Sequence, residues 1–507
     1  MRCCITFSCT RTSAGGETGQ HWQLLFKIMR TYIFWLTGLL LLNNARTGQA
    51  QSHAPDTLLS HPLLRPRAVA PMAADSNAAA TLGEAFRQGR FGAHVRTVFM
   101  ATTNHRVREH NYYAHGIGAG LSYETKAWHH LQVGLEGFFL KNLYSSQLHK
   151  DSVRAESRYE LSLFDIENPR NRALLQQVEE LWVAWQPTPG FRLVYGRQHL
   201  DTPLLNSQNS RLSPNLVQGL WATATLRPST TLRGGWLTRV APRSTDRWFR
   251  LDESVGRYGM GVAPDSSAGR YAGAVHTRGL AVMGLRQTLA SNAALQLWQY
   301  YADHLLATTY AEGTASLPRP SGVWTAGGQL LWQRALAPDG SPTPSQRYLA
   351  DGEQARALSL RLTHQHGPWQ LAGQYTRVTA HGRFLFPREW GREPFYTTLP
   401  RERLEGAGDV HAGSVTASWQ RSSQTRLEIG YGYYNLSSQA RLNKYSVPDF
   451  HQLNLSATKA FGVAAEGLRL RALYVAKLGA SRADYVPNRA VNKVDLHHLT
   501  MAMDYEF

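Results

Sequence analysis

Arginine residues at alternating positions of predicted strands are the side chains best suited to chemistry in this chain. The clearest segment is LRLRALYVAK, in which Leu468 and Leu470 alternate with arginines. A guanidinium group stays charged and binds a carboxylate through two hydrogen bonds, so a row of them offers successive weak anion sites. For any single arginine, an ion pair with a neighbouring acid is the alternative. The arginines at such polar positions are Arg96, Arg192, Arg233, Arg239, Arg469 and Arg471.

Residues 196–219 (GRQHLDTPLLNSQNSRLSPNLVQG) form a polar insert between two short alternating runs, FRLVYG and GLWATATL. The insert contains Pro203 and Pro214, which we expect to stiffen it. A long irregular connection between neighbouring strands is uncommon in a compact domain and is usually functional. We therefore expect this insert to fold into a barrel and to narrow it.

Signals for catalysis or metal binding are weak. The sequence has no G-x-S-x-G, H-E-x-x-H or phosphate-binding loop. All three cysteines fall in the first nine residues, so the rest of the chain has no disulfide or cysteine metal site. We predict no enzyme activity, no metal site and no cofactor. The histidine groups without evident acidic partners are His129-His130, His364 with His366, and His497-His498.

Alternation with a period of two runs from about residue 89 to the end of the chain. In HGIGAGLSYE, for example, Ile117, Ala119 and Leu121 alternate with glycines. An apolar face opposite a polar or small face is expected both for a membrane barrel strand and for a half-buried soluble sheet. The end of the chain favours the barrel, because HHLTMAMDYEF alternates and ends on the aromatic residue Phe507.

About eighteen such runs are present, with an uncertainty of two either way. An even number is expected for a single-chain bacterial barrel, and eighteen strands enclose an aqueous channel. Besides four runs near residues 90, 116, 130 and 497, they begin near Val178, Phe191, Leu220, Thr231, Arg278, Ala293, Leu305, Ala326, Ala357, Trp369, Ser414, Arg426, Phe450 and Leu468. The aromatic residues expected at the two membrane interfaces are Trp182, Trp185, Tyr195, Trp221, Trp236, Trp298, Trp332 and Trp419.

Composition excludes two other classes of protein. The mean hydropathy of −0.36 and a single apolar run argue against a polytopic helical membrane protein. The formal net charge of +18 suggests nucleic-acid binding. However, the arginines are dispersed at the spacing of strands, and no zinc-finger spacing occurs. We predict no nucleic-acid partner and an anion-attracting lumen.

The amino-terminal region has the layout of an exported protein. Met29 is followed by Arg30, an apolar core of about ten residues and small residues before position 50, which is typical of a signal peptide. We predict that residues 1–28 are a non-native upstream extension and that 29–50 are the signal peptide. Residues 51–81, rich in Pro, Ala and Ser, are expected to form a flexible periplasmic leader before a barrel over 82–507. The alternative is an uncleaved signal anchor.

Several of these stretches resemble the OprD-type family of outer-membrane porins, and specifically bacteroidetes-type members. TLGEAFRQGRFGAHVRTVFM and YYAHGIGAGLSYET resemble the first two strands of the family. The insert 196–219 is similar to the third outer loop, and GRFLFPREWGREPFYTTLPRERLEGAGDVHA (382–412) is similar to the seventh. These inserts fall between predicted strands 5 and 6 and between strands 13 and 14. The resemblance implies an all-β transmembrane antiparallel barrel of about 18 strands with inward-folded outer loops.

The resemblance also implies candidate solute contacts, because the third and seventh loops of the family form a constriction and a track of lumen arginines guides anionic groups. This chain lacks the loop disulfide of some members, so we expect prolines and salt bridges to order the loops. The implied residues are Arg197, Asp201, Asn206, Ser210, Arg211 and Asn215 in the third loop, and Arg388, Glu389, Arg392, Glu393, Arg401, Glu402 and Arg403 in the seventh. Arg211 is the preferred candidate.

The leading functional hypothesis is a passive outer-membrane channel for small anionic or zwitterionic solutes, such as amino acids, peptides or carboxylates. An outer-membrane hydrolase and a plugged structural or adhesion barrel are the alternatives. The expected partners are outer-membrane lipid and lipopolysaccharide, small solutes, and the barrel assembly machinery, which in this family recognises a last strand ending on an aromatic residue such as Phe507.

Overall fold

The computed structural model describes residues 78–105, 110–152, 154–208, 210–338, 340, 342–462, 465–480 and 491–507. The predicted extension 1–28, the signal peptide 29–50 and most of the leader 51–81 lie outside the described residues and stay predictions. No described helix is long and apolar enough to cross a membrane.

Strands make up most of the described chain. Helix α2 (Leu82–Arg87) is followed by β1 (Arg90–Asn104), β2 (Tyr112–Glu124), β3 (Leu131–Ser145), β4 (Leu175–Thr188), β5 (Phe191–Gln198), β6 (Leu216–Arg227), β7 (Thr230–Ala241), β8 (Phe249–Arg250) and helix α3 (Leu251–Ser254). The later strands are β9 (Leu280–Ala290), β10 (Ala293–Ala302), β11 (Leu306–Arg319), β12 (Gly322–Ala335), β13 (Gln354–His366), β14 (Trp369–Val378), β15 (Val410–Ser422), β16 (Thr425–Asn435), β17 (Phe450–Ala460), β18 (Leu468–Gly479) and β19 (Leu496–Glu506). Short 3-10 helices η3 (Leu161–Leu163), η4 (Pro344–Gln346) and η5 (Ala440–Leu442) lie in the connections.

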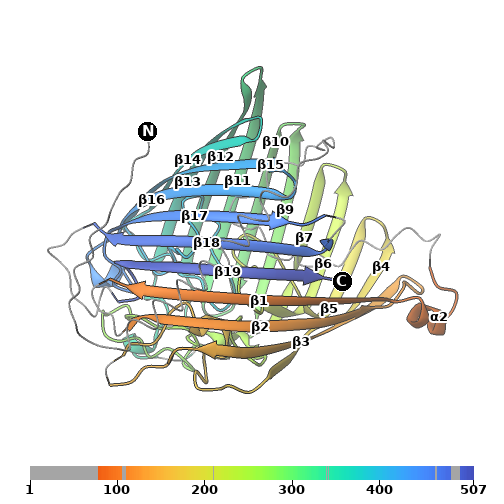
Figure 1. Ribbon diagram of the computed structural model, residues 1–507, viewed down its shortest axis with the longest axis horizontal. Helices are drawn as coiled ribbons and strands as arrows, with labels where there is room; N and C mark the ends of the chain where they lie inside the picture. The colour runs from red at the N-terminus through yellow and green to blue at the C-terminus, as the bar shows by residue number, and fades with distance from the viewer. Residues whose placement is uncertain are drawn as a thin grey trace, which may run out of the picture. The chain divides into compact units, whose positions relative to one another are not determined.

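The strands close into one barrel. β1 pairs in antiparallel register with both β2 and β19, so the first and last strands share a seam, and Figure 1 shows β19 beside β1. Of the 19 strands in the sheet, β8 has only two residues, and β7 pairs directly with β9, so 18 strands form the wall. The predicted strand number and order are confirmed.

Successive side chains alternate between the outer face and the lumen. In β18, Arg469 lies opposite Asp504 of β19, and Leu473 lies opposite Thr500, with all four on the inner face. The outer face exposes large apolar side chains such as Leu360. This is the apolar-out, polar-in pattern of a membrane barrel.

Three of the aromatic residues expected at the membrane interfaces do not face lipid. Trp182, Trp221 and Trp298 are buried on the inner side of the wall. Trp236 and Trp332, by contrast, are exposed on the outer face, as expected. The prediction was wrong for these three because an indole group is stable both at a membrane interface and in the packed interior of a barrel whose loops fold inward.

The two ends of the barrel differ. One end has short turns, such as Gly367-Pro368 between β13 and β14, and the other has the long loops, which in such barrels are extracellular. The third loop is shorter than the predicted insert, because β5 continues to Gln198 and β6 begins at Leu216. We name five long connections L2 (146–174), L3 (199–215), L4 (242–279), L7 (379–409) and L8 (436–449).

Candidate pore constriction

L7 lies against the inner wall of the barrel. The side chain of Gln333 on β12 donates to the carbonyl of Leu385 at 2.7 Å, and Gln329 on the same strand donates to Pro394 at 3.0 Å. Further round the wall, Gln452 on β17 donates to the carbonyl of Pro400 at 2.8 Å. These inward-facing amides satisfy backbone groups of the loop, so the contacts place L7 inside the barrel, as expected from the resemblance.

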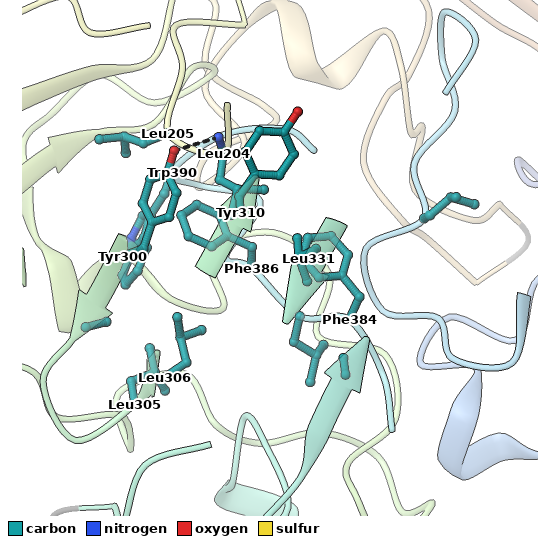
Figure 2. Packing of buried hydrophobic residues seen from close by; sticks show 14 of the residues in the cluster. Leu204, Leu205, Tyr300, Leu305, Leu306, Tyr310, Leu331, Phe384, Phe386 and Trp390 are labelled. Carbon is teal, nitrogen blue, oxygen red and sulfur yellow. Dashed lines mark hydrogen bonds between the residues drawn. The ribbon is translucent and has the colours of Figure 1, made fainter. Parts of the chain in front are cut away.

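An apolar cluster anchors L7 to the wall. Phe386 and Trp390 of L7 pack with ring centroids 5.6 Å apart, and Phe386 lies 5.8 Å from Tyr300 of β10. Figure 2 shows these rings gathered with Tyr310 and Leu331 from β11 and β12. We expected prolines and salt bridges to replace the missing disulfide. Aromatic burial is an additional source of loop order, because each such ring buries about 150–250 Å².

L3 and L7 are joined through Asn206. Its amide donates to the carbonyl of Arg392 at 2.8 Å, and its carbonyl oxygen accepts from the backbone amide of Arg392 at 3.2 Å. The two chains approach so closely that a Cβ on Gly391 would lie 1.9 Å from the carbonyl oxygen of Leu204. L3 is also held to the wall, because the amide of Leu204 donates to the Tyr300 hydroxyl at 3.2 Å (Figure 2).

Glu405 is the central counter-ion of L7. Its carboxylate accepts a hydrogen bond from the guanidinium of Arg388. It also accepts from the hydroxyls of Tyr348 and Tyr445, both at 3.1 Å. The ammonium of Lys444 in L8 lies 3.5 Å away. Although burial opposes ionisation, Lys444 and Arg388 hold the pKa of Glu405 below its ordinary value. Arg388, predicted as a solute contact, is therefore a structural ion-pair partner.

Four other arginines gather where L3, L4 and L7 meet. Arg211, Arg243, Arg392 and Arg403 interact electrostatically with one another, and none of them forms an ion pair with a described residue. Their hydrogen bonds go to neutral acceptors. Arg403 donates to Gln208 of L3 and to the carbonyl of Gly391, and Arg243 donates to the hydroxyl of Ser210 at 3.3 Å. The cluster is a concentration of positive charge held by the loops.

Burial is the main influence on the pKa values of this cluster, and neighbouring arginines and acids modify them. Burial, together with Arg403, lowers the pKa of Arg211 to about 10. Burial and the neighbouring guanidinium groups of Arg388 and Arg392 likewise lower the pKa of Arg403 to about 10. Both side chains are charged at neutral pH. Because their mutual repulsion is relieved by a negative charge, the cluster is suited to attract anions.

The remaining loop candidates mostly hold the loops together. Asp201 accepts from the amide and hydroxyl of Ser207, Asn215 accepts from the amide of Arg243 at 2.7 Å, and Glu389 accepts from two amides of L4. Arg211 is buried, and its Nε donates to Ser162 of L2 at 2.5 Å. It therefore contributes charge rather than an open side chain.

Three further loop candidates, Glu393, Glu402 and Arg401, also form hydrogen bonds or ion pairs inside the barrel. Glu393 accepts from the amide of Leu404, and Glu402 pairs with Lys477 of β18. The Arg401 guanidinium donates to Thr500 of β19 at 2.6 Å. Each of these contacts ties L7 to itself or to the wall.

The strand arginines divide between the two faces. Arg96, Arg192, Arg233, Arg469 and Arg471 face the lumen, as predicted. Arg197 and Arg239 do not: Arg197 shares the outer face with Tyr195, and a bulge in β7 turns Arg239 outward beside Arg197. These two are corrected, because alternation counted from residue spacing fails at a bulge and at a strand that runs further than expected. Arg96 is paired with Asp504, so the ion-pair alternative applies to it.

Sequence reasoning missed several inward cations, of which Arg243 and Arg361 are two. Arg243 follows directly after β7 in a loop that carried no recognised motif. Arg361 of β13 faces the lumen with its guanidinium 4.2 Å from the ring centre of Tyr396. The alternation RALSLRLTHQH contains the signal for Arg361, but no local signal marks Arg243.

Solved structures of similar fold include outer membrane protein OpdK of Pseudomonas aeruginosa. Pseudomonas aeruginosa OccK8 (OprE) matches with a TM-score of 0.66 at 12% identity, covering 83% of this chain and 99% of that chain. P. aeruginosa OpdK, solved with vanillate, matches with a TM-score of 0.64 at 12% identity and the same coverage of 83% and 99%. Acinetobacter baumannii OccAB1 matches with a TM-score of 0.62 at 12% identity, covering 83% and 97%. At this identity these similarities establish the fold alone.

The match to a protein family is more specific than the similarity of fold. No curated protein matches the sequence. The family described as outer membrane porin, OprD family, matches residues 191–398, a region that contains L3 and most of L7. With this match and the closed eighteen-strand wall, the chain is an outer-membrane-type β-barrel that is similar to the porins of the OprD family.

Proposed function

We propose that this porin is a passive channel selective for small anionic or zwitterionic solutes, with carboxylates such as amino acids and peptides as the substrate class. The observation that carries the proposal is the cluster of Arg211, Arg243, Arg392 and Arg403, which lacks ion-pair partners among the described residues where L3, L4 and L7 meet. Guanidinium groups bind carboxylates in planar, two-pronged geometry. The relative OpdK was solved with vanillate, an aromatic carboxylate, which supports this class.

The lumen arginines extend this positive charge along the wall. Arg471 and Arg469 lie on β18, and Arg233 lies across the barrel on β7, close to Arg286 of β9. Weak, successive cationic positions favour passage over retention. Arg96 is neutralised by Asp504, so we assign the attraction of anions to the loop cluster and to the other arginines rather than to a continuous track.

Ion selectivity tests the proposal. We predict that Arg243→Gln lowers the chloride-over-potassium permeability ratio, because the substitution removes one positive charge from the cluster and Arg243 forms no ion pair with a described residue. One unit charge at about 4 Å in water contributes about 1 kcal/mol, so the ratio should fall by up to about fivefold. The measurement is the reversal potential of single channels in planar bilayers under a KCl gradient.

A matched control is Arg356→Gln, which removes an exposed arginine from the outer face of β13. It should leave the reversal potential unchanged. An equal shift in both variants would show a non-specific surface-charge effect, and a native protein without conductance would favour a plugged barrel. Liposome swelling with vanillate against a neutral solute of similar size tests the substrate class directly.

A further inference from the structure

A buried acidic group lies on the inner wall where β3, β4 and the start of L3 meet. It consists of Glu136, Glu179 and His199, whose nearest ligand atoms all lie within 4.8 Å of one another. Glu179 is 2% exposed and Glu136 is 8% exposed. Glu136 also lies 3.4 Å from Nδ1 of His94 on β1, whereas Glu179 forms no ion pair with a described residue.

A β-bulge brings the two glutamates together. Glu136 pairs with Glu180, but the next residue, Gly137, pairs with Val178, so Glu179 is the extra residue of β4. Val178 remains exposed on the outer face, whereas Glu179 and Glu180 are both buried. A bulge allows consecutive side chains to share one face and often occurs beside functional sites.

Two polar atoms in the group have no partner. The Oε1 atom of Glu179 and the Nδ1 atom of His199 are buried and form no hydrogen bond. Burying an unsatisfied polar group destabilises a protein, and burying an unsatisfied charged group does so more strongly. The second ring nitrogen of His199, Nε2, lies 3.7 Å from the carboxylate of Glu180, so Nδ1 is the nitrogen open to another ligand.

We propose that Glu136, Glu179 and His199 bind a divalent first-row transition-metal ion of the Zn²⁺ or Mn²⁺ type. One imidazole and two carboxylates suit these ions, whereas Ca²⁺ and Mg²⁺ prefer oxygen ligands alone. Each metal–ligand bond is about 2.1 Å, so two ligands of a tetrahedral ion are about 3.4 Å apart, and the three groups, now within 4.8 Å of one another, must move closer when an ion binds. Glu180 beside His199 is the carboxylate that orients a metal-bound imidazole.

The position of this site gives the ion a structural consequence. Glu136 and Glu179 belong to the wall, and His199 is the first residue of L3. A bound ion therefore ties the beginning of L3 to β3 and β4. It also neutralises the buried acids, which lie next to a loop that carries the cationic Arg211.

Metal binding by the purified full-length protein in detergent tests the inference. After treatment with a chelator, the protein is titrated with Zn²⁺ and with Co²⁺, whose visible absorption reports coordination. We expect one ion per chain and a loss of affinity of about tenfold or more in Glu179→Gln and in His199→Gln. The matched control is Glu167→Gln, from the second acidic group formed by Asp165, Glu167 and Asp246, in which Glu167 already pairs with Arg247 and Arg257.

Three outcomes would overturn the site: no stoichiometric binding to the native protein, unchanged affinity in Glu179→Gln and His199→Gln, or loss of affinity in Glu167→Gln alone. Heat-dependent mobility on SDS gels shows whether each variant forms a barrel. If Glu179→Gln does not fold, the affinity of His199→Gln, at the rim of the wall, tests the site. The readout does not depend on ion selectivity, so the metal-binding result is independent of the proposed function.

Discussion

Glu405 illustrates how single residues order the constriction. Its buried carboxylate forms ion pairs with Arg388 and Lys444 and accepts hydrogen bonds from two tyrosine hydroxyls. Removing one member of a buried ion pair typically destabilises a protein by about 3–5 kcal/mol, because the partner is left charged without compensation. The order of L7 therefore depends on ionised glutamates as much as on its apolar anchor.

This dependence predicts acid sensitivity of L7. The folded pKa of Glu405 is lowered by Lys444 and Arg388, and that of Glu402 is lowered chiefly by Lys477, both from an ordinary value of 4.5. For a carboxyl with a lowered pKa, the stabilisation is present above the ordinary value and is lost as pH falls through the folded value. We expect open-channel current noise to rise as pH is lowered below 4.5, measured on single channels between pH 7 and pH 3.

The variant Glu405→Gln serves as the comparison for the acid experiment. It cannot ionise, so its channel should be noisy already at neutral pH. Glu466→Gln, an exposed glutamate in a short turn, should behave like the native protein. Quiet native channels at pH 3 would contradict the assignment of Glu405 as the counter-ion that orders L7.

At the scale of elements, L3 and L7 act as one unit. Asn206 exchanges two hydrogen bonds with the backbone of Arg392, and Gly391 lies directly against the carbonyl of Leu204. Trp390 beside Gly391 is fully buried and donates to the hydroxyl of Ser254 in helix α3 at 2.9 Å. The distance between the loops is therefore set by packing that tolerates no added atom at Gly391.

We predict that Gly391→Ala separates L3 from L7. The new Cβ would meet the Leu204 carbonyl at 1.9 Å, so one of the two backbones must move. Single-channel conductance should change, and the Arg392 backbone should lose its contact with Asn206. The matched control is Gly373→Ala in β14, where a Cβ meets nothing within 4 Å. Identical conductance in the native protein and Gly391→Ala would show that this contact does not shape the passage.

At the scale of the whole barrel, the seam between β1 and β19 closes the wall. Eleven residue pairs, from His94 with Glu506 to Asn104 with Leu496, join the two strands. Next to the His94–Glu506 pair, the amide of Phe507 donates to the carbonyl of Ala93 at 2.9 Å, and Phe507 is 71% exposed. The terminal ring is therefore accessible at the end of the strand that completes the barrel.

We predict that Phe507→Ala lowers the amount of barrel assembled in the outer membrane, because the exposed terminal ring is the feature that the assembly machinery is expected to recognise. The amount of heat-modifiable protein in isolated outer membranes measures the effect. Phe91→Ala removes another exposed outer-face ring, at the start of β1, and should leave assembly unchanged. Equal assembly of both variants and the native protein would contradict this role of Phe507.

The sequence by itself determined the wall of this barrel. The inward positions of Arg469 and Arg471, the order of the strands and the place of the two inserts all follow from period-two alternation, because each residue of a strand faces opposite to its neighbour. The resemblance of the two inserts to family loops indicated the asparagine and arginines of L3 and L7, although not what each of them binds.

Only the tertiary structure decided how the lumen is filled. Bulges turned Arg239 outward and Glu179 inward, Arg211 was buried against L2, and Arg243 of L4 joined arginines of two other loops. These outcomes depend on contacts between segments far apart in the chain, and a bulge shifts every later side chain to the other face. Local alternation indicates neither the long-range contacts nor the bulges. The wall was therefore predictable from the sequence, and the chemistry inside it was not.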